Sequence, residues 1–332
     1  MKVVLATLVI IEILVGASFL GYYYKETRVS MRSFDQRKVA IINRGGVEKK
    51  PSPNFLYYSE LVSNNIIESQ LPWDSGVEIK YKINNDGLND RKNYDLVKPK
   101  NTFRIITLGD SFTFGHYVST DNNWPEQLEE LLNTKEVCPS TTIEVINLGM
   151  WGFDINYLIK RYKDIGKKYE PDMVVWFESG SGFTRLVETM EPLSVECEKQ
   201  IENFVSLDVL KRIKYSGECW GQSQHKVVVD LGEDGLKRVM TTYLDDLFTI
   251  LDQSIFFYVT FEKIESGINA ESTLNFWKNR YDKVHFSKIP NLKQGELFPD
   301  GHPSTLGHKK IAESIFELVK ESNSQELCIT EN

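Results

Sequence analysis

The sequence predicts an α/β protein of three layers, in which helices cover both faces of a parallel sheet of about five strands. From residue 103 to residue 320, short apolar segments rich in β-branched residues alternate with helical patterns. One long apolar run near the N-terminus adds a predicted membrane helix. The composition is that of a folded chain, since 41% of the 332 residues are hydrophobic and 26% are charged.

Residues 3–24 form the apolar run, VVLATLVIIEILVGASFLGYYY. A hydrocarbon core of about 30 Å needs about 20 such residues in a helix. Glu12 is the only charged residue, and the three tyrosines would lie at the interface. We interpret residues 1–25 as a transmembrane anchor, with a cleaved signal peptide as the alternative. Basic residues after the run favour a cytoplasmic body, whereas the cysteines favour an oxidising compartment, and we expect a membrane-anchored, extracytoplasmic body.

Residues 26–100 are mixed and polar, and we interpret them as a stalk followed by a short β element. Apolar and charged residues alternate from Val77 to Ile83, which predicts a half-buried strand. Asn84–Gly87 has the composition of a turn.

Residues 101–322 form the main predicted domain, and 323–332 a C-terminal tail. Its strands are expected at Phe103–Leu108, Ile143–Leu148, Asp172–Phe177, Ile255–Phe261 and Val284–Ile289. Its helices are expected to start near Asn123 and to cover 154–169, 236–251 and 305–320. Residues 183–235 show no clear strand–helix rhythm, and we interpret them as an insertion that forms a lid or substrate wall. Ligands bind at the carboxyl ends of parallel strands, so the chemistry is expected there.

The first strand ends in Gly109-Asp110-Ser111, a turn that can hold a serine hydroxyl above the sheet. The turn is not the Gly-x-Ser-x-Gly elbow, because Thr113 stands at the last glycine position, and it is not a phosphate-binding loop. Asp300 and His302 stand two residues apart in the last loop. A serine needs a base to take its proton, and that base needs an acceptor on its other nitrogen. These residues therefore predict a Ser–His–Asp site.

These segments resemble the GDSL-type, or SGNH, esterases and acylhydrolases. The resemblance covers about residues 77–182 and 284–320, and it also rests on Asn84–Arg91, Phe103–Ile105, Asn147–Gly152 and Pro171–Val175. It implies a flavodoxin-like parallel sheet and ester hydrolysis without a cofactor.

The resemblance also implies roles for single residues. Ser111 would be the nucleophile, His302 the general base and acid, and Asp300 the residue that orients His302. The amides of Ser111 and Gly152 would form the oxyanion hole, with Gly149 as the alternative to Gly152. The family has an asparagine donor in a Gly-x-Asn-Asp block, where this chain reads FESGSG at 177–182. By spacing, Ser181 stands at the asparagine position and would supply a shorter donor.

The expected function is a membrane-anchored serine ester hydrolase that removes acyl groups from a small-molecule, polysaccharide or lipid ester. One alternative is an O-acyltransferase in cell-envelope polysaccharide modification. Another is a protein that has lost catalysis and binds a glycan or a partner. A net charge of −8 without a basic block argues against nucleic-acid binding. No ligand spacing indicates a metal site.

Four cysteines allow three pairings. We predict a Cys197–Cys219 disulfide within the insertion, and a Cys138–Cys328 bridge is geometrically possible.

Six further polar or aromatic residues lie in or next to the candidate segments. Asp110 is expected to anchor its turn through backbone amides, and His308 to be structural, bonded to a carbonyl. His116 either lines the pocket or lies in an exposed loop. The remaining candidates for substrate contact, each with a structural alternative, are Glu178, Trp151 and Phe153.

Overall fold

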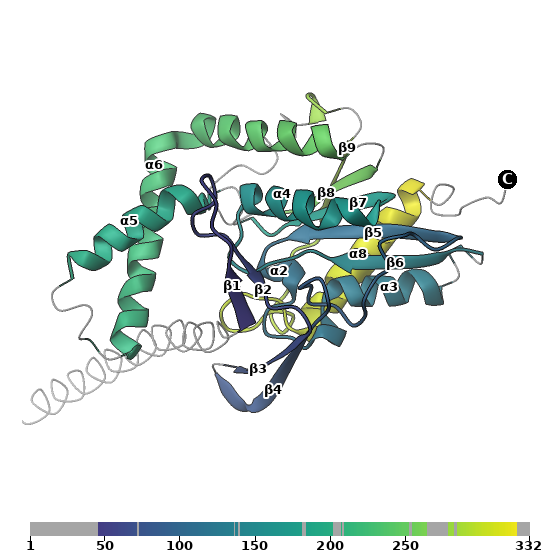
Figure 1. The fold of residues 1–332 in the computed structure, drawn as a ribbon, viewed down its shortest axis with the longest axis horizontal. Helices are drawn as coiled ribbons and strands as arrows, with labels where there is room; N and C mark the ends of the chain where they lie inside the picture. Colours follow the sequence, from purple (N-terminus) through teal and green to yellow (C-terminus); the bar gives the residue numbers. More distant parts are fainter. Residues whose placement is uncertain are drawn as a thin grey trace, which may run out of the picture.

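The computed structural model describes residues 46–71, 73–135, 137–138, 140–180, 184–201, 207, 209–251, 254–263, 278–281 and 284–323 (Figure 1). The predicted membrane helix and the first part of the predicted stalk lie outside these residues. Within the ranges just given, no helix combines the length and the apolar character that crossing a membrane requires.

A parallel sheet of five strands forms the centre of the molecule, in the order β6-β5-β7-β8-β9. All four neighbouring pairs are parallel. The predicted α/β sheet is thus confirmed, with boundaries within about two residues of those expected. The strands are β5 (Thr102–Gly109), β6 (Thr142–Asn147), β7 (Met173–Glu178), β8 (Ile255–Phe261) and β9 (Val284–Ile289).

The two faces of the sheet build two separate hydrophobic cores. Ile105 and Val175 face one core, and Ile106 and Val174 face the other, because successive side chains of a strand point to opposite faces. Every residue of β5 and of β7 is buried. This burial on both faces explains why both strands are rich in apolar residues, although Arg104 and Thr107 interrupt β5.

Helices cover both faces, as the sequence predicts. On one face, α3 (Trp124–Thr134) and α8 (Thr305–Asn323) pack against the strands. On the other lie α4 (Ile155–Asp164) and the C-terminal part of α6 (Val209–Ile250). Asn123 and Asp154 cap α3 and α4 by accepting the amide of the third following residue. The helix expected over 154–169 is shorter than predicted, because it ends at Asp164 and a 3-10 turn, η3 (Gly166–Tyr169), follows.

Residues 183–235, which we interpret as an insertion without a clear strand–helix rhythm, are largely helical in the part of the chain that the structure describes. They contain α5 (Val187–Lys199) and the first part of α6. The helix expected over 236–251 is the second limb of α6, which bends at Gly232, where φ is 62°. Figure 1 shows the two limbs, with α5 lying against the first. Cys197 and Cys219 join α5 to α6 by a disulfide. Cys138 is also disulfide-bonded, but its predicted partner Cys328 lies outside the described residues.

Residues 46–100 contain more β structure than the one strand expected. The hairpin β3 (Asn65–Leu71) and β4 (Asp74–Ile83) includes the predicted strand, and β1 (Val47–Lys49) pairs with β2 (Ser59–Leu61). Tyr58, Leu61 and Tyr81 are buried in the same core as α4. This region is therefore packed into the body of the protein.

The strand order places the site. Starting from β5, the chain moves to one side to form β6 and then crosses to the other side to form β7. The connections diverge at the carboxyl ends of β5 and β7, which is where open parallel sheets bind ligands.

Candidate active site

Ser111 begins a helix of one turn, α2 (Ser111–Phe114), directly after β5. Asp110 caps this helix, since its Oδ1 accepts the amide of Phe112 at 3.0 Å. The expected anchoring role of Asp110 is thus present. A side chain at Gly109 would overlap Thr113 and the carbonyl of Phe177, so glycine lets the turn pack between β7 and α2.

Asp300 and His302 lie in the loop before α8 and reach Ser111 across the top of the sheet. His302 Nε2 lies 2.9 Å from Ser111 Oγ. His302 Nδ1 lies 2.7 Å from Asp300 Oδ2, and the backbone amide of His302 donates to Asp300 Oδ1 at 3.1 Å. The intervening Gly301 has φ 91°, a left-handed conformation that favours glycine. One intervening residue is therefore enough to bring the carboxylate onto the imidazole.

The tautomer of His302 follows from these contacts. The Asp300 carboxylate can only accept, so Nδ1 carries the proton and Nε2 is free to accept from the Ser111 hydroxyl. The Asp300 side chain is 5% exposed and that of His302 is 24% exposed. The carboxylate is thus screened from water, while the imidazole remains accessible to a substrate.

Aromatic rings surround the His302 imidazole. The rings of Phe112 and Tyr117 both lie 5.5 Å from it, and that of His116 lies 5.1 Å away. His116 is buried, so the expectation of an exposed loop histidine is wrong. Burial, with a smaller contribution from His302, lowers the pKa of His116 well below its usual value. His116 is therefore a neutral ring beside the site.

Two backbone amides are available on this side of the sheet. Those of Ser111 and Gly152 have no hydrogen-bond partner among the residues that the structure describes. Gly152 follows β6 with φ 75°, and a side chain there would meet open space. The alternative, Gly149, does not fit, because its amide donates to Asn147 Oδ1 at 2.9 Å. A side chain at Gly149 would also collide with Thr113 and the amide of Phe114, so its role is close packing.

The exit of β7 brings further polar groups to Asp110. Ser179 Oγ donates to Asp110 Oδ2 at 2.7 Å, and Arg185 Nη1 lies 4.0 Å from the same oxygen. Arg185 Nη1 also donates to the carbonyl of Phe153 at 3.3 Å. Arg185 thus joins the residue before Ser111 to the residue after Gly152. Ser181, the predicted third oxyanion donor, lies outside the described residues.

Ser179 and Arg185 are additions to the residues expected from the sequence. Ser179 could have been found, because it stands in the same strand exit as Ser181. Arg185 carries no sequence signal, because it lies in the insertion, which shows no clear strand–helix rhythm.

Three of the other expected residues, Glu178, Phe153 and His308, are built into the described fold. Glu178 is buried, and its Oε1 accepts the amide of Gly180 at 2.8 Å. Phe153 is core, whereas Trp151 is half-buried beside Phe114. His308 is fully buried, but among the described residues neither ring nitrogen has a hydrogen-bond partner, so the expected bond to a carbonyl is not found there.

The arrangement is suited to moving a proton from a hydroxyl to an imidazole. The Ser111 hydroxyl, the His302 ring and the Asp300 carboxylate form one continuous chain of hydrogen bonds. Within the described ranges, no group of three or more His, Cys, Asp or Glu residues could hold a metal ion.

Several solved structures are similar to the chain at low identity. TesA is 12% identical with a TM-score of 0.43, over 66% of this chain and 98% of that one. The psychrotrophic esterase EstA from Pseudoalteromonas sp. is 13% identical with a TM-score of 0.38, over 67% of this chain and 98% of that one. The family 3 carbohydrate esterase of Clostridium thermocellum is 16% identical with a TM-score of 0.40, over 66% and 96%.

No family model matches the chain, and no curated protein matches it. TM-scores below 0.5 carry no functional conclusion.

Proposed function

We propose that the protein is a carboxylic ester hydrolase with Ser111 as nucleophile, His302 as general base and acid, and Asp300 as the residue that orients His302. One observation carries this proposal: Ser111 Oγ, His302 and Asp300 form a chain of hydrogen bonds of 2.9 and 2.7 Å at the carboxyl ends of the sheet. A serine hydroxyl becomes a useful nucleophile when an oriented imidazole removes its proton.

The reaction follows from the positions of these atoms. Ser111 Oγ attacks the ester carbonyl carbon while His302 Nε2 takes the hydroxyl proton. His302 then gives that proton to the leaving alcohol oxygen, and the acyl group stays on Ser111. A water attacks this acyl-enzyme, His302 takes its proton, and the proton returns to Ser111 Oγ as the carboxylic acid leaves.

The oxyanion formed in each step needs hydrogen-bond donors. The free amides of Ser111 and Gly152 support a hole on the β5–β6 side. Ser181 is the proposed third donor, by its position in the exit of β7. Removing one such donor costs about 10²–10³ in turnover, so a shortened donor slows such an enzyme but does not abolish activity.

The proposed substrate class is an acyl ester of a carbohydrate or a lipid. The rings around His302 continue outward from Tyr117 to Trp73 and Phe298, which lie 5.1 and 6.2 Å away. Half-buried aromatic faces of this kind suit a sugar ring or an acyl chain.

We also propose that the body is anchored to a membrane and lies outside the cytoplasm. Residues 3–24 support the anchor, and the Cys197–Cys219 disulfide supports an oxidising compartment. Release of the chain from membranes by alkaline carbonate would contradict the anchor. Protection of the body from protease added to sealed spheroplasts would contradict the outward orientation.

The first experiment compares the full-length protein with Ser111→Ala and His302→Gln on p-nitrophenyl acetate and butyrate. We expect both variants to lose at least 10³-fold in kcat/KM. His225→Gln is the matched control, because His225 is exposed on α6, and it should keep wild-type activity. A phosphonate probe should label Ser111 in the wild type, with the site located by mass spectrometry.

The outcomes separate the candidate functions. Equal activity of the wild type and Ser111→Ala, with no labelling of Ser111, would overturn the proposal. Faster consumption of ester when sugar acceptors are added, with an acylated sugar as product, would show acyl transfer by the same three residues.

A further inference from the structure

A short segment outside the sheet contacts both halves of the candidate site. Asn89 and Asp90 follow β4, and each is 1% exposed. We call these two residues the Asn89–Asp90 link. Its contacts run to the helix that begins with Ser111 and to the loop that leads to Gly152.

The first contact holds the end of α2. Asn89 Nδ2 donates to the carbonyl of Phe114, the last residue of α2, at 2.7 Å. Asn89 Oδ1 accepts the Thr120 hydroxyl at 2.5 Å, which fixes the amide orientation. A helix of one turn has little stability of its own, so an external donor at its end limits how far Ser111 can shift.

The second contact holds the end of β6. The backbone amide of Asn147 donates to Asp90 Oδ2 at 3.2 Å, and Asn147 Nδ2 donates to the carbonyl of Asn89 at 3.3 Å. Asn147 Oδ1 in turn accepts the amide of Gly149, and the amide of Met150 donates to the carbonyl of Gly109 at 3.1 Å. The path from the link to the Gly152 loop is therefore continuous.

The position of β6 explains why such a link is needed. It is an edge strand, so every second backbone amide points away from the sheet. Side-chain oxygens accept hydrogen bonds from these amides. Asn133 accepts from the amide of Ile143 at 3.0 Å, and Glu129 accepts from that of Val145 at 2.8 Å. Asp90 accepts the last one, at Asn147, where the strand leads into the candidate oxyanion loop.

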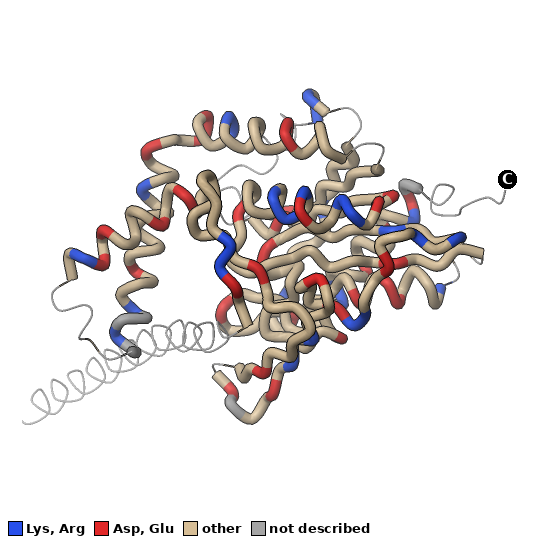
Figure 2. The backbone as a smooth tube through the Cα atoms, viewed as in Figure 1, with Lys and Arg blue, Asp and Glu red and all other residues tan. Residues whose placement is uncertain are grey.

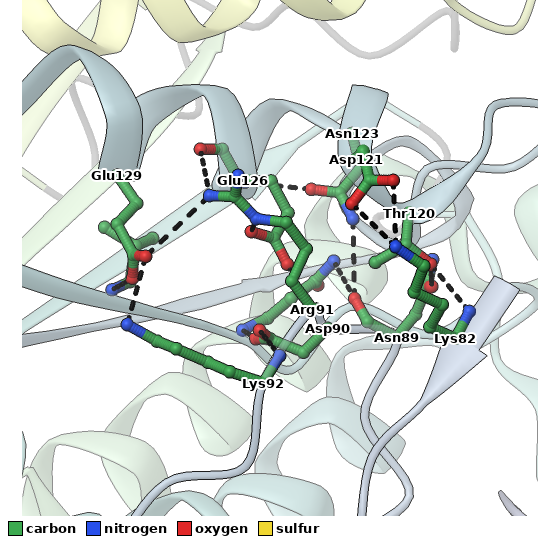
Figure 3. A network of polar contacts seen from close by, with 12 residues as sticks. Lys82, Asn89, Asp90, Arg91, Lys92, Thr120, Asp121, Asn123, Glu126 and Glu129 are labelled. Atoms are coloured by element: carbon green, nitrogen blue, oxygen red, sulfur yellow. Dashed lines mark hydrogen bonds and ion pairs between the residues drawn. The ribbon is translucent and has the colours of Figure 1, made fainter.

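Asp90 is itself held in a polar network (Figure 3). The Tyr94 hydroxyl donates to Asp90 Oδ1 at 2.8 Å. Burial, and then the neighbouring Glu126 carboxylate, raises the pKa of Asp90 well above its usual value. Arg91 pairs with Glu126, and Lys92 pairs with Glu129 at 3.1 Å, so the surrounding charges are largely compensated. Asp90 Oδ1 and Oδ2 both accept hydrogen bonds within this network, from Tyr94 and Asn147 respectively.

We propose that Asn89 and Asp90 are positioning residues for the site: together they set the placement of the Ser111 hydroxyl relative to the Gly152 amide. The inference rests on the proposed ester hydrolysis, in which nucleophile and oxyanion donor come from two different strand exits. A displacement of about 1 Å between such groups costs about 10²-fold in rate.

Asn89→Ala tests the first contact, with Asn84→Ala as the matched control. Asn84 is a buried asparagine of the same segment, but within the described ranges its side chain bonds only the backbone of residues 86, 88 and 92. We expect Asn89→Ala to lower kcat by about 10²-fold with little change in KM, and Asn84→Ala to lose stability without this fall in kcat. Equal kcat values for the two variants would overturn the proposal.

Asp90 offers a conservative rescue. An asparagine at position 90 keeps a side-chain oxygen that can accept the Asn147 amide, whereas an alanine has none. We expect Asp90→Asn to keep kcat within about threefold of wild type, and Asp90→Ala to lose it as Asn89→Ala does. Loss of activity in both, or in neither, would contradict the positioning role of Asp90. If Asn89→Ala does not fold, Thr120→Val, which frees the Asn89 amide, should lower kcat by about tenfold, and wild-type kcat would overturn the proposal.

Hydrogen exchange of the full-length protein separates this inference from the proposed reaction. Asn89→Ala should speed exchange of the amides at 111–116 and 148–153, whereas Asn84→Ala should not. Unchanged exchange at both segments would refute the positioning role of Asn89, even if the protein is an active esterase. Faster exchange in a protein that hydrolyses no ester would support the structural role of Asn89 in holding the two segments, and it would reject the proposed function.

Discussion

The sheet and the α5–α6 pair hold their residues in place by different means. In the sheet, strands with mostly uncharged residues are buried on both faces, and the polar groups of the site project only where the strands end. Charged residues are spread along α5 and both limbs of α6, as Figure 2 shows. A disulfide joins α5 to α6, and small residues form one buried line along α6.

This difference indicates in which region substitutions should affect activity. A strand exit in the sheet is fixed by neighbours on several sides, so small changes there move catalytic atoms. The first limb of α6 packs mainly against α5, so changes there should alter local stability and leave the proposed chemistry intact.

The largest effect is expected from Asp300→Asn. The amide can donate to His302 Nδ1 and thereby favour the wrong tautomer, with the proton on Nε2, where Ser111 needs an acceptor. We expect kcat to fall by about 10³–10⁴-fold with little change in the melting temperature. Ester hydrolysis and thermal unfolding measure the two effects. A kcat within tenfold of wild type would show that Asp300 does not orient the base.

The next effect is expected from Gly149→Ala, with Gly152→Ala as its control. A Cβ at position 149 would lie about 2.3 Å from the Phe114 amide nitrogen, whereas one at position 152 would meet nothing within 4 Å. We expect the first variant to lose about 3 kcal/mol or more in the free energy of unfolding. The second should lose about 1 kcal/mol, because its φ of 75° is strained for alanine. Urea unfolding distinguishes them, and equal losses would refute the tight packing of the oxyanion loop on α2.

The sheet could be predicted from the sequence because its signals are local. Ile105 and its neighbours in β5 are buried on both faces, which leaves a segment rich in apolar, β-branched residues between turn residues. The Gly109–Ser111 turn and the Asp300–His302 pair each span a few residues, so their chemistry is visible without knowing the fold.

The α5–α6 pair was not predicted because its buried line is made of small and polar residues. Cys219, Ser223 and Val227 recur every four residues and are at most 3% exposed, so they form one buried face of α6. Only Val227 counts as strongly apolar, and the helical period is therefore hidden. Counting cysteine and serine as interior residues would have revealed it.

The polar partners of the site could not be predicted because they are distant in sequence. Ser179 and Asp110 are 69 residues apart, and Asn89 and Asn147 are 58 apart. The pairing of β5 with β7 brings Asp110 and Ser179 together, whereas Asn89 reaches Asn147 from a segment outside the sheet. Neither local sequence indicates its distant partner.

Removing the disulfide tests the other region of the comparison. The double variant Cys197→Ser and Cys219→Ser opens a loop of 22 residues. The loss of this constraint on the unfolded chain should lower the free energy of unfolding by about 3 kcal/mol. We expect faster hydrogen exchange in α5 and the first limb of α6, with kcat unchanged. A parallel fall in kcat would show that the α5–α6 pair belongs to the site and would remove the distinction between the two regions.

The smallest effect, and the one that depends on pH, is expected from His308→Leu in α8. Burial, followed by the nearby His302, lowers the pKa of His308 to about 3, and its ring nitrogens have no hydrogen-bond partner in the described chain. A histidine with a lowered folded-state pKa supports folding fully above its unfolded pKa near 6.5, and this support is lost as the pH falls toward 3. At pH 5 the free energy of unfolding of the wild type should therefore be about 2 kcal/mol lower than at pH 8 because of this residue. His308→Leu should not show this loss, whereas His225→Leu, at an exposed position, should show it in full. Urea unfolding at the two pH values measures the difference. Equal acid sensitivity of His308→Leu and the wild type would mean that His308 is protonated, and hence solvated, in the folded protein.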